Sequence, residues 1–231
     1  MTLSTGSSDP GWEAVGFDLD GTLFDHRGAA TAGVAHLVRS LDRDPDPALT
    51  EAWFALETVH FEAWTSGRVS FTEQRRARVR EFSALLDRDV PHDPADADAL
   101  FERYLIGYRR SWRAYEDAAP LLRELREGGV RVGILTNGPE AQQREKLRTT
   151  GLDHLVDVVC TAEGIGFSKP DARAFHALVR GLDTPTERIA FIGDHPEQDV
   201  AGARAVGIRA GLVRRDGPES RGLRTALATA E

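Results

Sequence analysis

Residues 14–22 read AVGFDLDGT, an apolar run that passes directly into two aspartates, a glycine and a threonine. A short apolar run that ends in turn-forming residues is typical of a buried β-strand. We therefore predict a strand over residues 14–19, with Asp18 and Asp20 at its carboxyl end. The rest of the predicted fold is arranged around this strand.

After residue 120 the chain alternates between apolar runs and segments of helical periodicity. Predicted strands cover residues 130–135, 156–160, 188–192 and 208–213. Predicted helices cover residues 120–126, 139–149, 171–180 and 198–206, each followed closely by a glycine, and a short terminal helix comes after residue 216. Strand–helix alternation at this spacing favours right-handed crossovers and one parallel sheet, to which the strand 14–19 also belongs.

The segment between, from about residue 28 to residue 113, has helix-spaced apolar residues and no convincing strand. Breaks fall at residues 44–47, 66–67 and 91–94. The predicted fold class is therefore α/β, a doubly wound, Rossmann-like parallel-sheet core with an inserted α-helical cap domain. We assign residues 11–24 and 115–231 to the core, 25–114 to the cap and 1–10 to a flexible leader.

Composition excludes several classes of protein. The net charge of −8 argues against a nucleic-acid binder, which would carry a basic stripe. No apolar run approaches the roughly 20 residues that span a bilayer, and residues 1–10 lack the pattern of a secretion signal. The single cysteine, Cys160, lies in an apolar run and is predicted to be a buried structural thiol. We expect a cytoplasmic protein with no nucleic-acid or membrane partner, and its oligomeric state stays open.

Polar residues gather where the predicted strands end. They are Asp18, Asp20, Thr136, Asn137, Lys169, Asp194 and Asp199. In open parallel sheets the ligand binds beyond the carboxyl ends of the strands, so these side chains are expected to converge in one crevice. Lys169 is one of only two lysines, the other being Lys146, while arginine supplies the remaining positive charges.

The chemistry of such a cluster favours phosphoryl transfer. Neighbouring carboxylates repel one another and raise some pKa values, and a bound cation removes that repulsion. Sites rich in aspartate oxygens favour Mg²⁺, which usually also binds substrate phosphate. A lysine is a compact charge suited to phosphate, and a carboxylate can act as the nucleophile. Thr136 and the main-chain N–H near Asn137 can donate hydrogen bonds to phosphate oxygens.

Four motifs resemble those of the haloacid dehalogenase-like (HAD) superfamily, in the order found in that family. Residues 18–23, DLDGTL, resemble motif one, and residues 136–137, TN, resemble motif two. Residues 169–170, KP, resemble motif three, and residues 193–199, GDHPEQD, resemble motif four. The helical insertion is similar to the type-one cap in position and size, although it contains no diagnostic motif.

The resemblance implies a Mg²⁺-dependent phosphatase that acts on a small phosphoester. Asp18 would attack phosphorus and bind the metal. Asp20 would give its main-chain carbonyl to the metal, while its carboxyl protonates the leaving alcohol and then activates water. Asp194 would bind the metal directly.

The remaining residues would support these groups. Thr136 and Asn137 would bind the transferring phosphoryl group, and Lys169 would neutralise charge on it and on Asp18. Asp199 would orient either metal-bound waters or the Lys169 side chain without binding the metal itself. The roles of His195 and of the insertion are not indicated, and neither is the identity of the phosphoester.

Other chemistries of the superfamily are disfavoured by particular residues. A haloacid dehalogenase lacks the second aspartate of motif one, which is present here as Asp20. A phosphonate hydrolase needs a cap lysine and a phosphosugar mutase usually uses one, but residues 25–114 contain none. The mutase stays as the alternative because Asp20 would suit it. A non-catalytic phosphate-binding module is less favoured, since the set of acids is complete.

Residues 75–78, RRAR, carry three arginines within the insertion. We interpret them as a solvated helix face. The alternative is that they recognise an anionic substrate.

Overall fold

The computed structural model describes residues 11–217 and 220–231, so the predicted leader lies outside the described residues. The chain divides into two compact units, which are considered separately. One comprises the chain up to Asp25 together with Arg113–Glu231, and the other comprises His26–Trp112. We call them the sheet unit and the helical unit.

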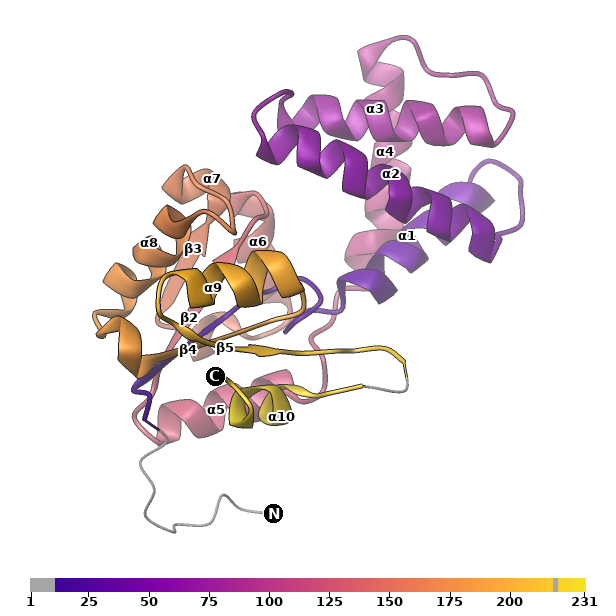
Figure 1. The fold of residues 1–231 in the computed structure, drawn as a ribbon. Coiled ribbons are helices and arrows are strands. Elements are labelled where there is room, and N and C mark those ends of the chain that lie inside the picture. The colour runs from indigo at the N-terminus through magenta and orange to yellow at the C-terminus, as the bar shows by residue number, and fades with distance from the viewer. Residues whose placement is uncertain (1–10, 218–219) are drawn as a thin grey trace. The chain divides into compact units, whose positions relative to one another are not determined.

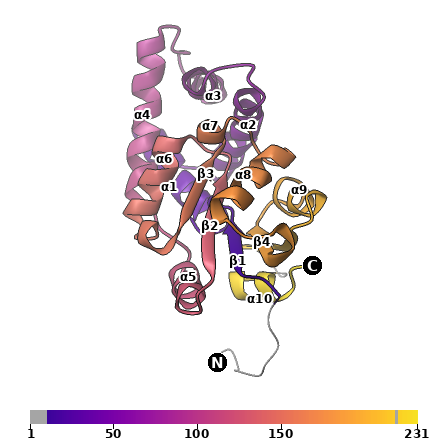
Figure 2. The ribbon, with the colours of Figure 1, turned by 90° about the vertical axis from the view of Figure 1, so that its left-hand side faces the viewer.

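The sheet unit contains five parallel strands. They are β1 (Ala14–Phe17), β2 (Arg131–Thr136), β3 (Val158–Thr161), β4 (Ile189–Gly193) and β5 (Arg209–Leu212). Their order is β3-β2-β1-β4-β5, which places β1 at the centre (Figure 2). The predicted Rossmann-like α/β fold is confirmed. Phe17 lies opposite Ile134 on β2 and Ile192 on β4, so the carboxyl ends of these three strands meet at one edge.

Helices cover both faces of this sheet. They are α5 (Ala118–Glu127), α6 (Glu140–Thr149), α7 (Ala162–Ile165), α8 (Ala172–Leu182), α9 (Gly202–Ala205) and α10 (Leu223–Ala228). Helices α8 and α9 pack together on one face, and α5 and α10 pack on the other (Figure 1). The strands β1 and β4 between them are wholly apolar and buried, as expected of a parallel sheet. Cys160 is buried on β3, as predicted, and burial raises the pKa of its thiol.

Two segments of the sheet unit differ from prediction. The helix expected over residues 198–206 is a π-helix, Pro196–Ala201, followed by the short α9. His195 precedes this helix and caps it, since its ring nitrogen Nδ1 accepts hydrogen bonds from the main-chain N–H groups of Glu197 and Gln198. The short α7 was not predicted. It follows β3 directly because Thr161 caps it by accepting a hydrogen bond from Gly164.

The two segments of the sheet unit that lead to and from the helical unit, residues 23–25 and 113–115, run antiparallel and are hydrogen-bonded to each other. Phe24 forms a bridge with Ala114. The main-chain N–H of Tyr115 donates to the carbonyl of Leu23 over 2.9 Å, and that of Asp25 donates to the carbonyl of Arg113 over 3.0 Å. Main-chain hydrogen bonds therefore join the outgoing and returning segments.

The helical unit consists of α1 (His26–Arg39), α2 (Pro47–Thr65), α3 (Phe71–Leu85) and α4 (Pro94–Arg110). Helices α2 and α4 each start with a proline after a capping aspartate, Asp46 and Asp93 respectively, and Ser70 with Glu73 forms a capping box on α3. Trp53 fills the centre of the unit, against Phe82 and Tyr104. Among the described residues, no helix combines the length and apolar character needed to cross a bilayer.

The interpretation of residues 75–78 as a solvated face is wrong for Arg78. Its side chain is buried, with one guanidinium nitrogen 2.6 Å from Glu57 Oε1 and the guanidinium carbon 4.8 Å from the ring centroid of Trp53. Burial alone would raise the pKa of Glu57, but the charges of Arg78 and His26 outweigh burial and hold that pKa well below its usual value. Arg78 is therefore a core residue whose charge is compensated inside the unit.

We expect Arg78→Met to destabilise the helical unit by about 1.5–3 kcal/mol, because the partly buried Glu57 loses its closest cationic partner and keeps the more distant His26, at 3.2 Å. Arg76→Met is the matched control. Arg76 lies on the same helix and pairs with Asp98 at the surface, so its loss should change the stability little. Urea unfolding followed by tryptophan fluorescence measures both. Equal small losses in the two variants would contradict the assignment of Arg78 to the core.

Candidate functional site

The predicted site residues come together at the carboxyl edge of the sheet. Asp18 follows β1 directly, Thr136 ends β2 and Asp194 follows β4. Carboxylate oxygens of Asp18, Asp194 and Asp199 all lie within 4.8 Å of one another. This grouping arises because β1 pairs in register with both β2 and β4.

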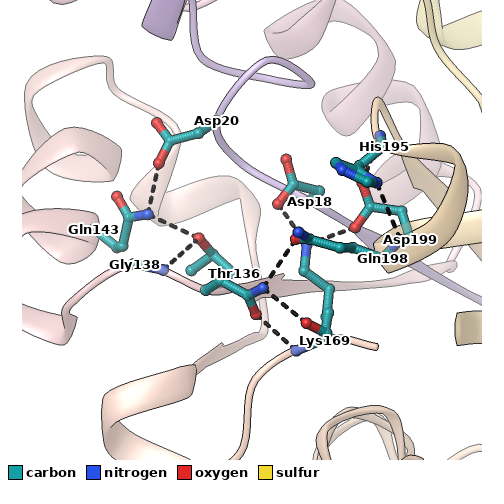
Figure 3. A network of polar contacts seen from close by, with 10 residues as sticks. Asp18, Asp20, Thr136, Gly138, Gln143, Lys169, His195, Gln198 and Asp199 are labelled. Carbon is teal, nitrogen blue, oxygen red and sulfur yellow. Dashed lines mark hydrogen bonds and ion pairs between the residues drawn. The ribbon is translucent and has the colours of Figure 1, made fainter. Parts of the chain in front are cut away.

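Lys169 lies buried between two of these acids. Its Nζ is 2.6 Å from Asp18 Oδ1 and 2.7 Å from Asp199 Oδ1 (Figure 3). Burial alone would lower the pKa of Lys169, but the two carboxylates raise it above its usual value, so the side chain stays protonated.

Asp18 has one oxygen that is not used. Oδ1 accepts the hydrogen bond from Lys169, whereas Oδ2 is buried and has no hydrogen-bond partner among the residues that the structure describes. Burial raises the pKa of Asp18 well above its usual value, and the nearby charges of Asp199 and Asp194 add to that rise against the opposing effect of Lys169. A carboxylate oxygen in this condition is suited to a further positive or electrophilic partner.

Asp194 adds negative charge at the mouth of the site. Its side chain retains an exposed surface, yet partial loss of solvation and then the charge of Asp199 raise its pKa to about 6. Gly21 lies against it with φ +85°, and a Cβ on Gly21 would meet Asp194 Oδ2 at 2.2 Å. Only glycine combines this backbone conformation with so close an approach. Three carboxylates facing one lysine leave an excess of negative charge that a divalent cation would balance, so the residues present fit a metal ion.

Asn137 uses its side chain to hold the main chain of Lys169. Its Oδ1 accepts from the N–H of Lys169 at 2.7 Å, and its Nδ2 donates to the carbonyl of Lys169 at 3.0 Å and to Gln198 Oε1 at 3.1 Å. With both ends of the amide engaged, contact between Asn137 and a phosphate would be through its main-chain N–H.

Asp199 is fixed from two directions. Oδ1 pairs with Lys169, and Oδ2 accepts the main-chain N–H of His195 at 2.9 Å. The π-helix starts shortly after β4 and places Asp199 near the carboxyl end of that strand. His195, whose role the sequence left open, caps that helix through its Nδ1.

The carboxylate of Asp20 is held by two residues that the sequence analysis missed. Gln143 Nε2 donates to Asp20 Oδ2 at 2.7 Å, and Lys146 Nζ donates to Asp20 Oδ1 at 2.6 Å. The same Gln143 nitrogen donates to Thr136 Oγ1 at 2.7 Å (Figure 3). The available signal was that Lys146 is one of only two lysines in the chain and lies in the predicted helix 139–149.

The comparisons with known proteins agree with this geometry. A model of the family described as "Hydrolase: haloacid dehalogenase-like hydrolase" matches residues 12–207, which is most of the chain. The chain belongs to this family. The resemblance inferred from the four motifs is therefore confirmed.

Several curated relatives of this HAD-like hydrolase are named as phosphatases. Phosphoserine phosphatase of Thermus thermophilus is 34% identical over 73% of this chain, a match that spans only 64% of that relative's own length. Ribulose-1,5-bisphosphate 5-phosphatase of Halopiger xanaduensis is 32% identical, over 84% of this chain and 82% of the relative.

A solved structure shows the same fold. It is YfnB of Bacillus subtilis, described as a HAD-hydrolase bound to magnesium. It superimposes with a TM-score of 0.76 at 20% identity, covering 89% of this chain and 90% of YfnB.

Proposed function

We propose that this HAD-like hydrolase is a Mg²⁺-dependent phosphatase that hydrolyses a small phosphomonoester through a phosphoaspartate on Asp18. The observation that carries the proposal is the state of Asp18. Its carboxylate is buried beside a protonated lysine and among other acids, with one oxygen free of hydrogen bonds among the described residues. The phosphatase names of the curated relatives support the same reaction.

The metal would be held by the carboxylates of Asp18 and Asp194 and by the main-chain carbonyl of Asp20. When bound, Mg²⁺ supplies positive charge that offsets the repulsion between the phosphate and the nucleophilic carboxylate. Asp199 would act through Lys169, with which it pairs.

In the first half of the reaction a carboxylate oxygen of Asp18 attacks phosphorus, and the bond from phosphorus to the leaving oxygen breaks. Asp20 donates a proton to that oxygen, so an alcohol leaves. In the second half Asp20 takes a proton from water, the water oxygen bonds to phosphorus and the bond to Asp18 breaks. Inorganic phosphate and the free carboxylate result. Positioned acid–base groups of this kind contribute roughly 10²–10⁴-fold.

The phosphoryl oxygens would be bound by the Thr136 hydroxyl, the main-chain N–H of Asn137 and the Lys169 ammonium. These groups are fixed before substrate arrives, since two hydrogen bonds join the Asn137 side chain to the main chain of Lys169, and the Lys169 ammonium donates to Asp18. Donors that need no rearrangement stabilise developing charge more effectively than mobile ones.

The substrate belongs to the class of small phosphomonoesters, and the two curated relatives act on different members of it. No observation favours the mutase alternative, since residues 25–114 lack the lysine that such enzymes usually carry. A cytoplasmic location stays a prediction.

The test is a phosphate-release assay over p-nitrophenyl phosphate and a panel of metabolite phosphomonoesters. We expect turnover with Mg²⁺ and a loss of at least about 10³-fold in excess EDTA, since a metal contributes several kcal/mol to charge stabilisation. Undiminished turnover in EDTA would overturn the metal assignment. Mg²⁺ binding without phosphate release from any panel member would favour a binding module instead.

A further inference from the structure

Gln143 and Lys146 are two buried side chains to which the mechanism above gives no role. They are three residues apart on α6, so they project from the same side of the helix, and each is only 1% exposed. Each donates to a different oxygen of Asp20. We propose that Gln143 and Lys146 are positioning residues that clamp the Asp20 carboxylate in the orientation needed for its two proton transfers. This inference rests on the function proposed above.

Stability alone does not account for Lys146. Burying an ammonium group costs free energy unless a partner compensates it, and apolar residues in place of a buried ion pair are often neutral or stabilising. Its charge is compensated by Asp20 at 2.6 Å and by the ring of Phe24, whose centroid is 4.8 Å from Nζ. The chain therefore places its two lysines on the two carboxylates of motif one: Lys169 on Asp18 and Lys146 on Asp20.

Gln143 connects the same carboxylate to Thr136. Its Nε2 lies 2.7 Å from Thr136 Oγ1, and the main-chain N–H of Gly138 donates to that oxygen at 3.3 Å. The hydroxyl therefore accepts twice and keeps its own proton to donate, which is what binding a phosphoryl oxygen requires. A Cβ on Gly138 would meet Gln143 Nε2 at 2.0 Å, so glycine is needed for this arrangement.

Loss of the clamp should slow different half-reactions, depending on whether the leaving group of the substrate needs a proton. An alkyl leaving group needs the proton of Asp20, whereas p-nitrophenolate leaves without one. Water attack on the phosphoaspartate needs Asp20 whichever substrate was used. A displaced Asp20 would therefore slow both steps with an alkyl phosphate but only the second step with p-nitrophenyl phosphate.

The experiment compares Lys146→Met with the wild-type enzyme by steady-state and rapid-mixing kinetics. For an alkyl phosphate we expect kcat to fall about 10²-fold, as for other small displacements of a catalytic group, with KM within about twofold. For p-nitrophenyl phosphate we expect a burst of about one equivalent of p-nitrophenolate per enzyme, followed by slow turnover.

Two further variants make the result specific. Arg148→Met removes an exposed cation from the same helix and should leave both substrates unaffected. Gln143→Met should reproduce the burst and in addition raise KM, because Thr136 loses its partner. Gln143→Met also decides the question if Lys146→Met does not fold, which thermal unfolding would reveal.

The outcomes separate this inference from the proposed function. If the wild-type enzyme turns over and both Lys146→Met and Gln143→Met keep wild-type kinetics, the clamp is overturned but the proposed function is not. Equal slowing of both substrates without a burst would also overturn it, because that pattern indicates general disruption of the structure. A wild-type protein that releases no phosphate from any substrate would overturn both the proposed function and the clamp.

Discussion

Asp18→Asn is expected to reduce phosphate release by about 10⁴-fold or more, since removing a nucleophile eliminates the covalent route. Asparagine keeps the shape of the side chain, and Lys169 retains its ion pair with Asp199, so the protein should still fold. The assay is p-nitrophenyl phosphate hydrolysis in Mg²⁺. In the wild-type enzyme, acid quenching during turnover should trap a phosphoaspartate that mass spectrometry places at residue 18.

Asp44→Asn is the matched control for this substitution. Asp44 is exposed in the loop between α1 and α2, so its substitution should leave the rate unchanged. Normal turnover by Asp18→Asn, with no label at residue 18 in the wild-type enzyme, would refute the nucleophile assignment.

Lys169→Met should impair both catalysis and stability. Loss of the fixed charge beside Asp18 should lower kcat by about 10³-fold, as for other electrostatic groups aimed at a transition state. The variant also leaves Asp18 and Asp199 buried without their cation, which costs about 3–5 kcal/mol. Because Mg²⁺ would replace part of the missing charge, its addition should raise the unfolding midpoint of the variant more than that of the wild-type protein.

Arg173→Met serves as the control for Lys169→Met. Arg173 lies four residues after Lys169 and pairs with Asp171 at the surface, so its loss should change the stability little. An unfolding midpoint of Lys169→Met in EDTA equal to that of the wild type would contradict the compensating role of this lysine.

The sequence predicted those features that depend only on the local residue pattern and on position along the chain. Runs such as AVGF and the strand–helix alternation predicted the parallel sheet, because buried parallel strands must be continuously apolar. Asp18 and Asp194 could be grouped in advance because any residue that follows a parallel strand lies at the same edge of the sheet.

What the sequence did not indicate depends on contacts between distant segments. Nothing near Arg78 in the chain shows that Glu57 and Trp53, on another helix, will enclose it. Gln143 and Lys146 were missed because only the packing of α6 decides which side of that helix faces Asp20. The π-helix at Pro196–Ala201 depends on a choice between alternative main-chain hydrogen bonds, which residue pattern does not resolve.

The paired crossing at residues 23–25 and 113–115 has a consequence for how such a protein can diversify. Because the outgoing and returning segments are bonded to each other, the sheet unit is closed by its own hydrogen bonds. The insert is then comparable to a long loop on a pre-formed hairpin stem, and exchanging it need not disturb the backbone that carries the acids. The insert can therefore be exchanged during evolution while the main chain that positions Asp18 and Asp20 stays the same.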